Sequence, residues 1–173
     1  MKERASWLAP LAMLLVTVAC ESGKAPGASS GPPARTDRVR PMFVRGPTGG
    51  TPVAPFIAAE LSKGRAEHHG VLVYVGATWC EPCQRFHQAV RSGELDDILD
   101  GVRLIEFDLD ADREPLQAAG YGSQLIPLFA LPKADGTASP QRIEGSIKGP
   151  DAVAQNLVPR LRSFLRGQAE QGH

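Results

Sequence analysis

The chain of 173 residues has no excess of charge, because 19 Lys and Arg balance 19 Asp and Glu. A nucleic-acid-binding protein needs a basic excess or stripe, so this balance argues against a nucleic-acid partner. Long apolar runs are also scarce: a single stretch, at the N-terminus, could enter a membrane, which excludes a multi-span transporter. Cysteines number only three, and an odd count means that each needs its own explanation.

The first cysteine, Cys20, directly follows the apolar run of residues 5–19. That run is shorter than the roughly 20 residues of a spanning helix and is typical of the hydrophobic part of a secretory signal. The ending Ala19-Cys20 resembles a bacterial lipoprotein signal, in which the cysteine becomes the first mature residue and carries acyl chains. Thr17 departs from that pattern, where an aliphatic residue is usual. A plain secretory signal and a retained membrane anchor are the alternatives.

All three readings place the domain outside the cytoplasm. The lipoprotein resemblance implies a periplasmic protein that is lipid-anchored to the cell envelope through Cys20. Glu21, rather than Asp, follows this cysteine. By resemblance to the sorting rule of Gram-negative lipoproteins, that residue favours the outer membrane.

Residues 20–50 predict a flexible linker. Their last 30 positions contain five Pro and six Gly, and large apolar residues are nearly absent before Met42-Phe43-Val44. Such a composition buries too little surface to offset its ordering entropy. The apolar triplet leaves two readings open, a short first strand or an exposed patch. The predicted divisions are a signal peptide at 1–19, the linker at 20–50, a globular domain at 51–167 and a disordered tail at 168–173.

From residue 51 onward, helical and strand patterns alternate. The predicted strands are continuous apolar or β-branched runs, apart from a last edge strand, and cover 71–75, 102–107, 128–131 and 141–144. The predicted helices cover 55–69, 81–99 with a break near Ser92-Gly93, 114–119 and 151–165. We expect Asp151 to cap the last helix and Pro159 to kink it. This order predicts an α/β domain with a mixed central sheet, whose first strands are parallel and last pair antiparallel, and with helices on both faces. The core candidates are Phe86, Val90, Phe107, Phe129 and Leu131.

The segment with the clearest chemistry is Trp79-Cys80-Glu81-Pro82-Cys83, between a predicted strand and a predicted helix. Cys80 would lie at the helix N-terminus, where unpaired N–H groups and a partial positive charge favour a thiolate. Its pKa is therefore expected below the free value of about 8.5. Cys83 follows one turn later, within reach of a disulfide, and Pro82 is tolerated in a first turn. Thiolate attack, a mixed disulfide and resolution by the second thiol can then follow.

Two other readings of the cysteine pair stay open. A structural disulfide would close a loop of four residues and contribute about 2 kcal/mol in the chain-entropy model. A metal site could use Cys80, Cys83 and His87, but structural zinc takes four ligands and no second C-x-x-C exists. We therefore predict no metal.

The run from Gly76 to Cys83, followed 43 residues later by Ile126-Pro127, resembles the thioredoxin superfamily over about residues 51–165. The resemblance implies a thioredoxin-like three-layer sandwich with Cys80 and Cys83 as the catalytic pair. It also implies a cis Pro127 beside the disulfide. The backbone of Ile126 would pair with a substrate chain, and Trp79 would cover the site and shape substrate contact.

Two extracytoplasmic branches look most similar. The dipeptide Glu81-Pro82, expected to modulate the pair, is similar to that of anchored thiol reductases of cytochrome c maturation. The run Cys83-Gln84-Arg85-Phe86-His87, followed by Gly93-Glu94-Leu95, is similar to the periplasmic C-terminal domain of the transmembrane disulfide reductase. Because both branches mostly donate electrons, these likenesses favour a reductase of protein disulfides, which would need a membrane electron donor. The sequence does not decide the direction of electron flow, and an oxidant would need an electron acceptor instead. No organic cofactor is needed, because the redox centre is the cysteine pair.

The sequence departs from cytoplasmic thioredoxin at Tyr74, where that family has a buried Asp that accepts the proton of the second thiol. Glu81, water or another group must take that proton here. Two rivals use the same fold: a copper-handling protein, although copper carriers of this kind have three residues between their cysteines, and a non-catalytic binding module with a static disulfide.

For the remaining polar residues, the sequence favours ordinary structural roles over catalysis or metal binding. His68-His69 is expected at a solvated helix end, and His87 is expected as an ordinary histidine or as a group that tunes the thiol. The aspartates, which suggest an acidic loop rather than a cation site, are Asp108, Asp110 and Asp112.

Overall fold

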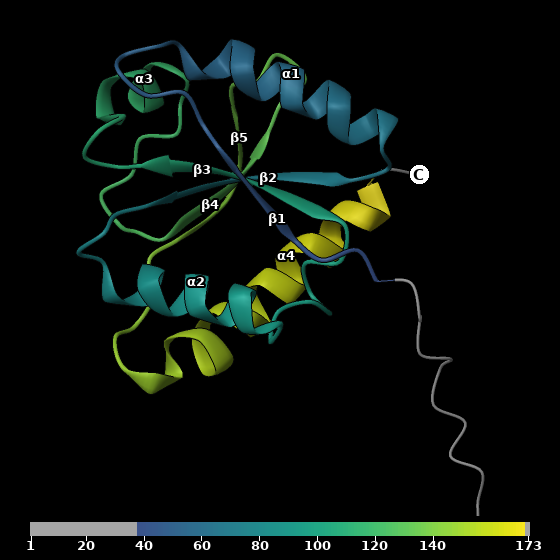
Figure 1. Cartoon of the computed structure of the whole chain (residues 1–173), viewed down its shortest axis with the longest axis vertical. Coiled ribbons are helices and arrows are strands. Elements are labelled where there is room, and N and C mark those ends of the chain that lie inside the picture. The colour runs from purple at the N-terminus through teal and green to yellow at the C-terminus, as the bar shows by residue number, and fades with distance from the viewer. Residues whose placement is uncertain (1–37, 172–173) are drawn as a thin grey trace, which may run out of the picture. The chain divides into compact units, whose positions relative to one another are not determined.

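A five-stranded mixed sheet forms the centre of the computed structural model, which describes residues 38–171 (Figure 1). Its strands are β1 (Met42–Arg45), β2 (Gly70–Gly76), β3 (Val102–Asp108), β4 (Leu128–Pro132) and β5 (Ala138–Glu144). Across the sheet they follow the order β1-β3-β2-β4-β5. The first three strands run parallel, whereas β4 is antiparallel to both β2 and β5. The predicted mixed sheet is confirmed.

Helices cover both faces of this sheet. They are α1 (Val53–Ala66), α2 (Glu81–Ser92), α3 (Arg113–Ala118) and α4 (Val158–Gln171), the last preceded by a 3₁₀ turn (Pro150–Ala152) and a π turn (Val153–Leu157). Figure 1 shows α1 and α3 on one face and α2 and α4 on the other. The three-layer α/β sandwich is therefore confirmed. Within the described residues, no helix combines the length and apolar content needed to cross a bilayer.

Strand β1 lies inside the stretch that the sequence assigned to the linker. Met42 to Arg45 pair with β3, and the ring of Phe43 packs 6.2 Å from that of Tyr74, measured between centroids. The strand reading of this apolar triplet is therefore right, and the ordered domain begins before residue 51. A four-residue strand carries too little periodicity to be recognised when its partner lies far along the chain. The predicted signal peptide and the linker up to residue 37 lie outside the described residues.

The C-terminal helix also differs from its prediction. It continues to Gln171, into the predicted tail. Asp151 makes no capping hydrogen bond, and its carboxylate accepts one from Gln155 Nε2 at 2.6 Å instead. Pro159 follows the π turn closely, in the first turn of α4. Because proline has no N–H and its ring crowds the preceding turn, an ordinary α-helical turn is disfavoured before Pro159, and a π turn stands there.

The core lies on both sides of β2 and β3. The second predicted helix stops at its expected break but does not resume, because residues 94–99 form turns and a bend. Helix α2 ends at Ser92, and Gly93 caps it with a φ of 82°, a left-handed conformation that favours glycine. The first ends earlier than predicted, at Ala66. Four of the five core candidates are buried, and Leu131 is only partly so.

Candidate redox site

Cys80 is the N-cap of α2, as predicted from its place between a strand and a helix. Strand β2 ends at Gly76, a short loop follows, and Cys80 adopts an extended backbone before Glu81 begins the helix. Pro82 lies in the first turn, where no intrahelical donor is lost. The sequence pattern therefore predicted the position of this cysteine correctly.

Cys80 and Cys83 form a disulfide, with an S–S distance of 2.08 Å and Cα atoms 5.2 Å apart. The backbone N–H of Cys83 also donates to Cys80 Sγ, at an N–S distance of 3.3 Å. Cys83 is 1% exposed and Cys80 4% exposed. Cys80 is thus the cysteine that holds both the helix N-terminus and the greater access to solvent.

The peptide bond between Ile126 and Pro127 is cis, as predicted. Pro127 directly precedes β4, and Leu128 pairs with Val75 near the end of β2. Because the cysteine loop leaves the sheet at that same end of β2, the register places the proline beside the loop. Pro127 is buried, whereas Ile126 is partly exposed.

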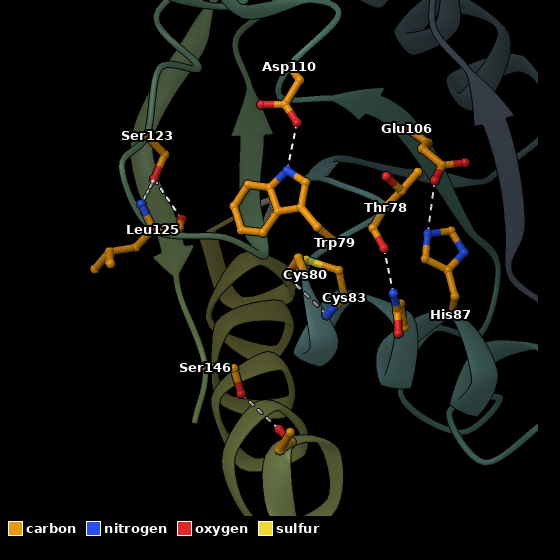
Figure 2. The surroundings of a disulfide bond; sticks show 12 residues. Thr78, Trp79, Cys80, Cys83, His87, Glu106, Asp110, Ser123, Leu125 and Ser146 are labelled. Carbon is orange, nitrogen blue, oxygen red and sulfur yellow. Dashed lines mark hydrogen bonds and ion pairs between the residues drawn. A yellow bond between two sulfur atoms is a disulfide. The ribbon is translucent and has the colours of Figure 1, made fainter. Parts of the chain in front are cut away.

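Trp79 has a largely exposed side chain beside the disulfide. Its side chain is 64% exposed, and its indole Nε1 donates to Asp110 Oδ2 at 2.6 Å. Figure 2 shows the indole directed at Asp110 beside the disulfide. Two other exposed apolar residues, Leu125 and Ile147, escaped the sequence analysis; Leu125 lies in the surroundings of the disulfide (Figure 2). In the sequence, only its position next to Ile126 could have indicated that Leu125 lies near the site.

Glu81 is held by groups outside the cysteine pair. Arg85 Nε donates to its Oε1 at 2.6 Å, and the backbone N–H of Gly149 lies 3.2 Å from both carboxylate oxygens. These two donors, Arg85 above all, lower the pKa of Glu81. Glu81 therefore connects the start of α2 to the loop before α4.

A buried phenol, Tyr74, lies on β2 and lines the same pocket as Cys83. Tyr74 is 1% exposed, and burial raises the pKa of its hydroxyl far above the ordinary value. A pocket of about 350 Å³ lies against it and is also lined by Cys83, His87 and Glu106. His87 Nε2 lies 2.8 Å from Glu106 Oε1 (Figure 2). The imidazole of His87 thus faces the carboxylate of Glu106. Because the two residues lie far apart in the sequence, no local pattern predicted that they would meet.

The acidic loop bonds to its own backbone. Asp108 accepts from the N–H groups of Asp110 and Ala111, and Asp112 accepts from that of Asp108. Over residues 38–171 no three His, Cys, Asp or Glu side chains are grouped to hold a metal ion. His68 is exposed in the turn after α1, as expected, whereas His69 is partly buried, with its Nδ1 3.2 Å from Glu67 Oε2.

The sheet order, the Cys80–Cys83 disulfide at the start of α2 and the cis Pro127 before β4 together define a thioredoxin-like fold with a redox-capable cysteine pair. No protein-family model and no curated protein matches the chain.

Solved structures similar to this chain include thioredoxins. A mutant thioredoxin from Halobacterium salinarum NRC-1 is 23% identical, with 72% of this chain and 90% of that chain covered and a TM-score of 0.42. Trichomonas vaginalis thioredoxin is 22% identical, with coverages of 71% and 96% and a TM-score of 0.43. Oxidized thioredoxin O2 from Arabidopsis thaliana is 18% identical, with coverages of 76% and 97% and a TM-score of 0.43.

Proposed function

We propose that this protein is a thiol–disulfide oxidoreductase that reduces protein disulfides. The observation that carries the proposal is the disulfide at the N-cap of α2, beside the cis proline. A thiolate at Cys80 would receive the Cys83 N–H and the positive end of the helix dipole, so its pKa is expected below about 8.5. Cys80 then attacks or is attacked, and Cys83 resolves the mixed disulfide.

The surroundings give each predicted binding residue a role in this proposal. Ile126, partly exposed beside the site, presents its backbone to an extended substrate chain. Trp79, fixed by Asp110, offers an exposed apolar face to that chain. Glu81 and Pro82 shape the first turn of α2. The substrates are protein thiols and disulfides, and the cysteine pair itself is the redox group.

The test is single and multiple turnover of the full chain with a peptide disulfide and a chemical reductant. Wild type is expected to turn over, Cys80→Ser to be inert, and Cys83→Ser to accumulate a mixed disulfide. Cys20→Ser is the matched control, because it removes a cysteine without changing the pair. Absence of turnover together with tight stoichiometric Cu(I) binding would support the copper-handling rival, and absence of both would support a static disulfide.

The direction of electron flow is tested by the reduction potential of the pair. A value near or below about −250 mV supports a reductase, whereas one near about −120 mV supports an oxidant. As a reductase outside the cytoplasm, the protein would draw electrons from a membrane donor.

We further propose that the protein is anchored to the periplasmic face of the cell envelope by lipid on Cys20, with Glu21 favouring the outer membrane. Both residues lie outside the described part of the chain. Incorporation of labelled palmitate into the full chain in a Gram-negative host, lost in Cys20→Ser, supports the anchor. Release of unlabelled wild type into the soluble periplasmic fraction contradicts it.

A further inference from the structure

The resolving step requires a proton acceptor for Cys83, and neither the buried phenol of Tyr74 nor the carboxylate of Glu81 is suited to be one. Tyr74 keeps its proton near neutral pH because burial raises the pKa of its hydroxyl. The carboxylate of Glu81 is held by Arg85 and Gly149. A base must therefore come from the other groups that share the pocket with Cys83.

A histidine and a glutamate side chain meet in that pocket. His87 lies one turn after Cys83 on α2, a spacing that puts both on the same face of the helix. Its Nε2 lies 2.8 Å from Oε1 of Glu106, the β3 residue that pairs with Tyr74. Figure 2 shows His87 turned toward Glu106. Cys83, His87 and Glu106 all line the pocket of about 350 Å³.

Aromatic contacts fix the orientation of the imidazole. The ring of Phe43, from β1, stacks on His87 with centroids 4.5 Å apart and an interplanar angle of 12°. Tyr74 meets the same imidazole edge-on at 5.3 Å. A ring held on two sides, with one nitrogen facing a carboxylate, has a fixed orientation from which its other nitrogen can accept a proton.

The charges around the pair come from several elements. Arg45 comes from the end of β1, Arg91 from α2, and Asp108 and Asp112 from the end of β3 and the loop after it. The bond from His87 is the largest cause of the lowered pKa of Glu106, and the two arginines act in the same direction. Asp108 accepts two backbone N–H groups of its own loop. Asp112 accepts one through Oδ2, its buried Oδ1 has no hydrogen-bond partner, and burial raises the pKa of its carboxyl.

We propose that the His87–Glu106 pair accepts the proton of Cys83, through water held in this pocket, as Cys83 resolves the mixed disulfide. The inference rests on the proposed function. A pocket of this size holds water readily, since one molecule fills about 30 Å³ of liquid. The Cys83 S–H bond breaks and its proton passes to the pair. The thiolate attacks Cys80, the Cys80–substrate bond breaks, the internal disulfide forms, and the substrate sulfur leaves as a thiolate that takes up a proton.

The test follows the two thiol reactions separately in the full chain carrying Cys20→Ser. Reduced protein is mixed with 5,5′-dithiobis(2-nitrobenzoate) in a stopped-flow instrument. The first release of the coloured thiolate reports attack by Cys80, and the second reports resolution by Cys83. Rates are measured from about pH 5.5 to 9.5, across the ordinary histidine and thiol pKa values, for wild type, His87→Gln and Glu106→Gln. His68→Gln, in the turn after α1, is the matched control.

We expect the second phase of both variants to slow by at least about 10-fold near pH 6.5 and to approach wild type above the thiol's ordinary pKa of about 8.5. The first phase should change little, and His68→Gln should match wild type in both phases. Because a purely structural effect would slow resolution at every pH, the shape of the profile separates the two roles. Thermal unfolding of each variant checks that it folds. If His87→Gln does not fold, the pH profile of Glu106→Gln tests the inference.

A second phase whose pH profile is unchanged in both variants overturns the inference and leaves the proposed function standing. A wild-type chain that shows no first phase, with Cys80 inert toward the reagent, overturns both.

Discussion

The ion pair between Glu60 and Arg103 gives a sharp prediction about stability. Glu60, on α1, is 2% exposed; Arg103 Nη2 donates to its Oε2 at 2.8 Å, and Lys63 Nζ donates to Oε1 at 2.5 Å. Removing one partner of a buried pair costs about 3–5 kcal/mol, because the remaining charge is left uncompensated. Since Lys63 stays in place, we expect Arg103→Met to lower the free energy of unfolding by about 2–3 kcal/mol.

Urea unfolding measures this loss. With a denaturant slope of about 1.5 kcal/mol/M, the midpoint should fall by roughly 1.3–2 M. The double variant Glu60→Gln/Arg103→Met should recover much of the loss, because it no longer buries an unpaired charge. Arg113→Met is the matched control: its partner Asp110 lies at 3.5 Å and both side chains are about half exposed, so a surface value of about 0–1 kcal/mol is expected.

The same pair predicts a pH dependence. Burial raises the pKa of Glu60, but the bonds from Lys63 and Arg103 outweigh it and hold the pKa below the ordinary value. A carboxyl with a lowered folded-state pKa contributes stability above its unfolded pKa and loses it as the pH falls through the folded value. The difference between wild type and Arg103→Met should therefore shrink below about pH 4. A loss under about 1 kcal/mol at pH 7, or a loss that is the same at about pH 3, would refute this reasoning.

Three further substitutions test the fold and the site. Gly136→Ala should cost about 2–3 kcal/mol in urea unfolding, because φ is +81° and a Cβ would overlap the Ala54 carbonyl oxygen, whereas Gly49→Ala, with φ +76° and open space, should cost about 1 kcal/mol. Phe43→Ala should cost about 1.5–2 kcal/mol, less than a fully buried phenylalanine, and a loss near zero would show that β1 contributes little. Trp79→Phe should raise KM for a peptide disulfide several-fold while leaving the thermal midpoint within a few degrees; an unchanged KM would remove Trp79 from substrate contact.

The elements that could be predicted well from the sequence carry their signal locally. Buried parallel strands read as continuous apolar runs, and the C-x-x-C between a strand and a helix placed Cys80 at the N-cap correctly. The cis Pro127 came from the resemblance, not from composition. By contrast, β1 and the His87–Glu106 pair depend on neighbours from distant positions, and no local pattern encodes them.

Errors also arose where a residue had several available partners. Asp151 has the right type for a cap, yet it bonds to Gln155. The bond from Trp79 to Asp110 likewise joins two residues that the sequence did not connect. Side-chain partners of this kind are chosen by tertiary geometry, which spacing alone does not reveal.

The parallel pairing of β1 with β3 affects how the chain can assemble during synthesis. The ribosome makes Met42 long before Arg103, the residue with which it pairs. Until that later segment has emerged, the backbone donors and acceptors of β1 can bond only to water or to unrelated chains. Closing so long a loop is entropically costly, so the edge of the sheet is expected to be among the last parts to become native. A nascent chain halted before β3 would therefore expose Phe43 to chaperones or to aggregation.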